Sequence, residues 1–219
     1  MVSGKAIDAR GYFMILNDLM KMFPKRAETL KAIYDEYRAA LNNSNGQVIG
    51  NKDEVAETFR QDVETAGVYV YFVWNINRWL TVKDDSEVVV EKVPYIYSLL
   101  TAETIENIDH KKALSLSEDV IDNPLLVAPW GLNDKEKLLI DGHHRILKKK
   151  LRDDSYVNVY YLTEDQSIDM MVSERYKNVY RIAISVIRLF NYLNSNRTDC
   201  PIYRFVDGDP SKSYKQNFV

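Results

Sequence analysis

The sequence predicts an α+β fold in which a small mixed sheet lies between helical flanking segments. Three observations predict it. Apolar residues recur at three- and four-residue spacing between residues 7 and 66, short β-branched and aromatic runs alternate with short helical segments between residues 88 and 162, and the helical period returns between residues 168 and 190.

The amino-terminal part is expected to be helical. Pro24 fits either a break after the first helix or the first turn of the second, and a third helix is expected to begin at an Asp53 cap and to end at Gly67. The apolar stripes of the three helices are Phe13, Leu16, Leu19, Met20 and Phe23, then Leu30, Ile33, Tyr34, Tyr37 and Leu41, then Val55, Phe59 and Val63. Residues 68–74 fit a strand or a buried helix, and their length does not decide between the two.

The middle of the chain is predicted to form a compact α/β unit. Thr101 is placed to cap a short helix, and residues 125–128 and 137–140 are expected to pair as a hairpin. The other expected elements are strands at 88–90 and 156–162, and helices within 111–121 and over 144–151.

After residue 163 we expect one long amphipathic helix and then a loose polar tail from Asn196. The predicted organisation is therefore a helical region at residues 1–87, an α/β unit at 88–163, and a carboxy-terminal helix and tail at 164–219. No internal repeat is visible in the sequence.

Composition excludes several classes of protein. The net charge of −3 over 219 residues argues against a surface built mainly to neutralise DNA phosphates. Cys200 is the single cysteine, which excludes an intramolecular disulfide and favours a reducing compartment. No signal-peptide pattern or membrane-spanning run is seen, so we expect a cytoplasmic protein with no membrane partner.

The most informative stretch is the apolar run 138–140 followed by Asp141, Gly142, His143, His144 and Arg145. A strand, a glycine turn and a helix start form a geometry that holds phosphate, because the first backbone N–H groups of a helix point outward and its dipole favours an anion. In this setting the glycine permits close approach of a phosphate, the histidines donate hydrogen bonds to it, and the arginine bridges its oxygens. The aspartate would hold Mg²⁺ or orient a histidine.

The same residues have a simpler interpretation. Asp141 and Gly142 also fit a tight turn with a capped helix, and two histidines at a helix start are often exposed polar residues. We favour the functional interpretation because the glycine, the arginine and the preceding strand occur together. A zinc site is not expected, since adjacent side chains diverge and no further ligand lies at a suitable spacing.

The unit resembles the ParB/sulfiredoxin-like superfamily over residues 88–162. The matching features are Val93-Pro94, the strand after Asn123-Pro124, the hairpin back to residues 139–145, and the closing strand 157–162. Members of this superfamily use the turn to hold nucleotide phosphates, but they include DNA segregation proteins, sulfinic-acid reductases, nucleases and kinases of free serine. The shared fold alone does not select among these activities.

Differences between this turn and the turn motifs of the individual branches favour some of these activities over others. Sulfiredoxins carry Gly-Cys-His-Arg, and His143 occupies the position of their reactive cysteine. Segregation proteins carry a Gly-Glu-Arg-Arg turn and a following helix-turn-helix module, for which the remaining chain is too short. The Asp-Gly-His-His-Arg form is most similar to the free serine kinases and related ATP- or ADP-using branches.

The resemblance implies a Mg²⁺-dependent phosphotransferase or ATPase that takes ATP or ADP and a small hydroxyl acceptor. Kinases of this kind place a catalytic glutamate in a helix early in the domain, and Glu103 and Glu106 are the leading candidates, with Glu118 also considered. From the chemistry alone, Asp109 is a further candidate base toward the acceptor hydroxyl.

Two other classes of function remain open. One is a ParB-like DNA-binding protein or nuclease of phage or mobile-element origin, for which the basic cluster Lys148, Lys149, Lys150 and Arg152 would contact nucleic acid, although a solvated helix face is the simpler interpretation. The other is a non-catalytic interaction protein whose helical flanks bind a partner. The sequence does not indicate an oligomeric state.

Overall fold

The structure is a computed structural model, and it describes residues 8–44, 57–82, 87–130, 137–195 and 198–219. The chain forms two compact units, one made of Met1–Asn75 with Met171–Val219 and the other of Ile76–Met170. Helices and strands occur in both units, so the predicted α+β class is confirmed. Among the described residues, no helix is both long and apolar enough to cross a bilayer.

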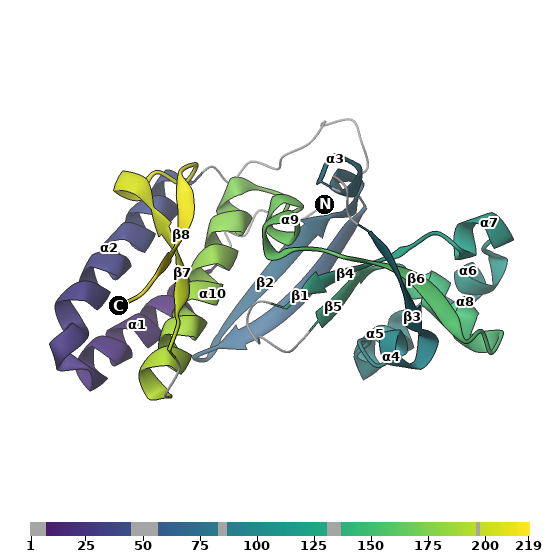
Figure 1. The fold of residues 1–219 in the computed structure, drawn as a ribbon, viewed down its shortest axis with the longest axis horizontal. Coiled ribbons are helices and arrows are strands. Elements are labelled where there is room, and N and C mark those ends of the chain that lie inside the picture. The colour runs from purple at the N-terminus through teal and green to yellow at the C-terminus, as the bar shows by residue number, and fades with distance from the viewer. Residues whose placement is uncertain (1–7, 45–56, 83–86, 131–136, 196–197) are drawn as a thin grey trace. The chain divides into compact units, whose positions relative to one another are not determined.

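The first unit joins the two ends of the chain. Two hairpins and three long helices form it, and the carboxy-terminal hairpin packs against α10 and α2 (Figure 1). Its elements are α1 (Arg10–Met22), η1 (Pro24–Arg26), α2 (Ala27–Asn43), β1 (Thr58–Thr65), β2 (Val68–Asn75), α10 (Glu174–Asn194), β7 (Pro201–Phe205), η3 (Val206–Gly208) and β8 (Ser213–Asn217). Tyr37, Phe72 and Tyr180 are fully buried in its core.

The second unit is built on a four-stranded mixed sheet with the order β3-β6-β4-β5. Strand β4 runs parallel to β6, whereas β3 and β5 run antiparallel to their neighbours. Its elements are η2 (Ile76–Arg78), α3 (Trp79–Val82), β3 (Val88–Lys92), α4 (Val93–Tyr97), α5 (Ala102–Asn107), α6 (His110–Ser115), α7 (Glu118–Ile121), β4 (Leu125–Pro129), β5 (Lys137–Asp141), α8 (His143–Leu151), β6 (Tyr156–Tyr161) and α9 (Glu164–Asp169).

The core of the second unit positions the turn between β5 and α8. Leu125 and Leu139 point from the sheet into a cluster that also contains Ile146 and Leu147 of α8 and Ile96 of α4. Burial of this apolar stripe holds α8 against the sheet. The helix therefore begins at a fixed place, directly after the end of β5.

The expected helix from Asp53 to Gly67 is wrong over its described part. Residues 58–65 form β1, which pairs antiparallel with β2. Phe59 and Val63 are four residues apart, a spacing that fits a helical stripe but also an alternating strand, and the alternating burial along β1 is that of a strand. Ala66 and Gly67 both have positive φ, as a two-residue hairpin turn requires. Asp53 and Val55 lie outside the described residues.

The expected loose tail is also wrong. Residues 201–205 and 213–217 pair as a hairpin whose Ile202 and Phe205 side chains are buried. The single long helix expected after residue 163 is divided, because Val172 donates its N–H to Val73 of β2 and Ser173 then caps α10. The expected turn at residues 84–86 lies outside the described residues.

Candidate functional site

The turn at residues 141–145 has the predicted strand, glycine and helix order. β5 ends at Asp141, Gly142 is the N-cap of α8 with φ +105°, and helical hydrogen bonding begins with the Ile146 N–H donating to the Gly142 carbonyl at 2.9 Å. A helix start directs its first N–H groups outward, and a glycine N-cap has no side chain to cover them. The geometry is suited to an anion.

Gly142 is required here for space as well as for backbone conformation. A Cβ atom at this position would lie 2.3 Å from Cδ2 of Leu125 and 3.1 Å from Nη2 of Arg145. Leu125 is fully buried, so it has little room to move aside. Close packing of β4 against the turn is what brings the backbone to this position.

Arg145 ties the turn to the sheet. Its Nη2 donates to Oδ2 of Asp141 at 2.8 Å and to the Pro124 carbonyl at 3.2 Å, which joins the end of β5 to the residue before β4. Both side chains of this ion pair are mostly buried, with 16% of Arg145 and 22% of Asp141 exposed. Nε of Arg145 is also buried and has no hydrogen-bond partner in the described structure. The guanidinium therefore fixes a positive charge beside the start of α8.

His143 is held in its neutral form. Burial lowers its pKa to about 4, the charges of His144 and Arg145 act in the same direction, and Asp141 and the Leu139 carbonyl oppose them. A neutral imidazole has one N–H group, and the hydrogen bond to the Leu139 carbonyl uses it, so the other ring nitrogen is an acceptor.

This environment predicts a dependence of stability on pH. Unfolded His143 takes up a proton near pH 6.5 and folded His143 only near pH 4, so the unfolded state binds more protons between these values. Stability should therefore fall by about 2 kcal/mol as the pH drops from 6.5 to 4. Urea unfolding of the wild type and of His143→Gln at several pH values measures this, and the variant should lack that part of the loss.

The control is His110→Gln, which removes an exposed histidine from the same unit. It should keep the wild-type dependence on pH. An unchanged pH profile in His143→Gln would contradict a buried neutral His143.

His144 lies within electrostatic reach of Asp109. The pKa of Asp109 is lowered first by the backbone N–H groups of Lys112 and Lys111, which donate to its carboxylate at the start of α6, and further by the charge of His144. Helices α6 and α8 are in contact, which brings the two residues together. Of the carboxylates that the sequence offered as a base, Asp109 is the one with a described link to the motif.

Glu103 and Glu106 occupy exposed positions on α5. No contact in the described residues joins either side chain to the turn. The Glu103 carbonyl accepts a hydrogen bond from the Asn107 side chain, as part of its own helix.

The donor set fits a phosphate better than a metal held by the protein. Asp141, the expected metal ligand, accepts a hydrogen bond from Arg145, and the described residues contain no cluster of three or more His, Cys, Asp or Glu side chains. Mg²⁺ bound with a nucleotide usually keeps phosphate oxygens and water as most of its ligands.

The basic cluster on α8 is engaged within its own unit. Lys148 donates to the carbonyls of Leu114 and Leu116, and Lys150 lies 3.4 Å from the centre of the Tyr97 ring. Lys149 pairs with Asp122, and Arg152 pairs with Glu118 and Asp154. The contacts with Leu114, Leu116, Glu118 and Asp122 hold α6 and α7 against α8, and they could not be predicted from the sequence because these partners lie far from α8 along the chain.

Comparison with known proteins gives no relative of this chain. No family model matches it, and no curated protein or solved structure matches it significantly. The resemblance to the ParB/sulfiredoxin-like superfamily therefore stays a prediction that depends on the motif and its strand, turn and helix setting.

Proposed function

We propose that the turn at residues 141–145 binds the phosphate of ATP or ADP, and that this unit hydrolyses the nucleotide or transfers its phosphate to a small hydroxyl acceptor. The observation that carries the proposal is the start of α8, where a left-handed glycine follows a buried strand and Arg145 is fixed beside it. Outward N–H groups and a nearby guanidinium are the features by which proteins hold phosphate.

The two histidines would have different tasks at this site. His143 is neutral at physiological pH and donates its single N–H to the Leu139 carbonyl, so it would hold the turn in place rather than donate to phosphate. His144 lies within electrostatic reach of the Asp109 carboxylate and would donate a hydrogen bond to a phosphate oxygen. Asp109, kept ionised by its helix-cap bonds, would orient His144 or accept the proton of a hydroxyl acceptor.

A nucleic-acid function has less support. The four cations of the cluster at residues 148–152 all have partners within the same unit, and three of these partners are carboxylates. Binding of DNA phosphates would have to compete with these contacts. A gel-shift assay at several salt concentrations, with a cleavage readout, distinguishes this function from nucleotide binding.

We expect His144→Ala to weaken the binding of ATP or ADP by about tenfold or more, since a charged hydrogen bond to phosphate is worth roughly 1.5–3 kcal/mol. Isothermal titration calorimetry with and without Mg²⁺ measures the affinity, and release of phosphate from the nucleotide measures turnover. His110→Ala, which changes an exposed histidine in the same unit, should bind as the wild type does.

Equal affinities in His144→Ala and the wild type, with both proteins folded, would remove His144 from the site. If the wild type binds neither nucleotide, the proposed function is wrong. Weaker nucleotide binding by His144→Ala, with an unfolding transition like that of the wild type, would support the proposed function.

A further inference from the structure

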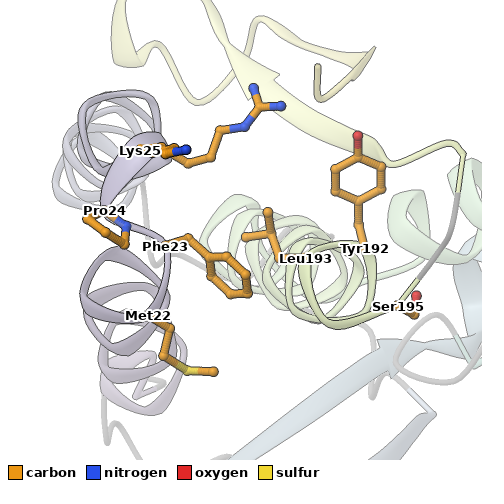
Figure 2. Close-up of a pocket in the computed structure, with 8 residues that line it drawn as sticks. Met22, Phe23, Pro24, Lys25, Tyr192, Leu193 and Ser195 are labelled. Atoms are coloured by element: carbon orange, nitrogen blue, oxygen red, sulfur yellow. The ribbon is translucent and has the colours of Figure 1, made fainter.

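The first unit contains a pocket of about 740 Å³ at the end of α1 and the last turn of α10 (Figure 2). Roughly 300–1,000 Å³ is usual for the binding site of a small molecule. The lining residues are Met22, Phe23, Pro24, Lys25, Arg26, Tyr192, Leu193 and Ser195. The phosphate-binding turn lies in the other unit, so this pocket is independent of the function proposed above.

The floor of the pocket is apolar. Figure 2 shows the Phe23 ring and the Leu193 side chain pointing toward one another from the two helices. Met22 next to them is 57% exposed and adds apolar surface to the pocket. A ligand with an apolar body would cover this surface and gain the free energy of burying it.

The rim of the pocket is positively charged. Lys25 and Arg26 are among the lining residues, and none of the eight is acidic. Arg26 is held in place, because its Nη1 donates to the Val219 carbonyl at 2.6 Å and its guanidinium lies over the Phe218 ring. The Lys25 side chain makes no hydrogen bond or ion pair with any described residue. Lys25 therefore offers the pocket an ammonium group that pairs with no acidic side chain among the described residues.

A hydroxyl group also belongs to the rim. In Figure 2 Tyr192 lies across the pocket from Lys25, and the Tyr192 ring packs edge-to-face on Phe218 at 5.9 Å. Phe218 thus supports both Arg26 and Tyr192 from behind. An ammonium and a phenol above an apolar floor match the two ends of an amphipathic acid.

We propose that this pocket binds a small amphipathic carboxylic acid. The apolar body would lie on Phe23 and Leu193, and the carboxylate would accept hydrogen bonds from Lys25 and Tyr192. The apolar part of the acid could be aliphatic or aromatic, because the lining suits both. The proposed ligand class is therefore an apolar group that carries a single carboxylate.

Titration of the whole protein with decanoate, 3-phenylpropionate, decanol and inorganic phosphate tests this proposal, with calorimetry or protein-detected NMR as the readout. At least one of the two acids should bind saturably and more tightly than decanol or phosphate. Lys25→Gln should weaken that binding by about tenfold, since a charged hydrogen bond is lost. Whichever acid binds more tightly identifies the body that the floor prefers.

Lys21→Gln is the matched control, because Lys21 lies one turn away on α1, is paired with Asp18, and does not line the pocket. It should bind the acid as the wild type does, while Leu193→Gln should weaken binding through the floor. Equal affinity for decanol and decanoate, unchanged binding in Lys25→Gln, or no saturable binding of either acid would each overturn the proposal.

Discussion

Replacing Gly142 with alanine is expected to lower the free energy of unfolding of the second unit by about 2–6 kcal/mol. A φ of +105° costs a residue with a side chain roughly 1–3 kcal/mol. The new Cβ would also lie 2.3 Å from Cδ2 of the fully buried Leu125, and overpacking of a core costs roughly 1–3 kcal/mol. Urea unfolding followed by circular dichroism measures the loss.

Gly67→Ala is the matched control for this substitution. Gly67 also has a positive φ, of +73°, but nothing lies within 4 Å of the Cβ that alanine would add. Gly67→Ala should lower the free energy of unfolding by about 1 kcal/mol, because only the left-handed backbone conformation is unfavourable for alanine there. Similar losses at the two glycines would show that contact with Leu125 adds nothing.

A second comparison isolates that contact. In a Leu125→Ala background the clash is gone, so Gly142→Ala should cost less than it does in the wild type, and the difference is the coupling between the two positions. Additive losses would contradict the close approach of β4 to the turn.

The local geometry of this turn could be predicted from the sequence, because it depends on neighbouring residues. An apolar run, a glycine and a polar helix start at residues 138–147 specify a strand, a turn and a helix by their own chemistry. The contacts of Leu125 and Pro124 with the turn could not be predicted in the same way. The expected pairing of residues 125–128 with 137–140 is confirmed, but these contacts also depend on the shift of its register between Leu126 and Val127 and on side-chain packing.

The identity of the candidate catalytic base also depends on tertiary packing that the local sequence does not predict. Glu103, Glu106 and Asp109 lie within seven positions of one another, and nothing in their local sequence distinguishes them. The contact between α6 and α8 is what brings Asp109 near His144, while α5 leaves both glutamates exposed. Side chains that meet through helix packing carry no periodic signal in the sequence.

The errors at β1 and at the carboxy terminus have a related cause. Short strands of about five to eight residues present few positions, so a spacing of four residues is compatible with either period. In the tail, buried residues occur on both sides of β7, which hides the alternation that would reveal a strand. Only the packing of these segments on α2 and α10 distinguishes a hairpin from a loose chain.

That packing predicts a large effect at Glu36, a residue of α2 that holds the carboxy-terminal hairpin. Its carboxylate accepts hydrogen bonds from Nε and Nη2 of Arg204 at 2.9 and 2.6 Å, and one from the Phe205 N–H at 2.5 Å. Glu36 is 14% exposed and Phe205 2% exposed, so solvent replaces these bonds poorly. Glu36→Ala should lower the free energy of unfolding of the first unit by about 2–4 kcal/mol, because it leaves a half-buried guanidinium and a buried N–H without their acceptor.

Asp35→Ala is the adjacent control on the same helix. Asp35 pairs with Lys31, but both side chains are 56% exposed, and an exposed ion pair contributes at most about 1 kcal/mol. Limited proteolysis adds a local readout, since release of β7 from α2 should expose the segment after residue 198 to cleavage in Glu36→Ala and not in Asp35→Ala. Equal stability and equal cleavage of the two variants would mean that burial of Ile202 and Phe205 holds the hairpin without the ion pair.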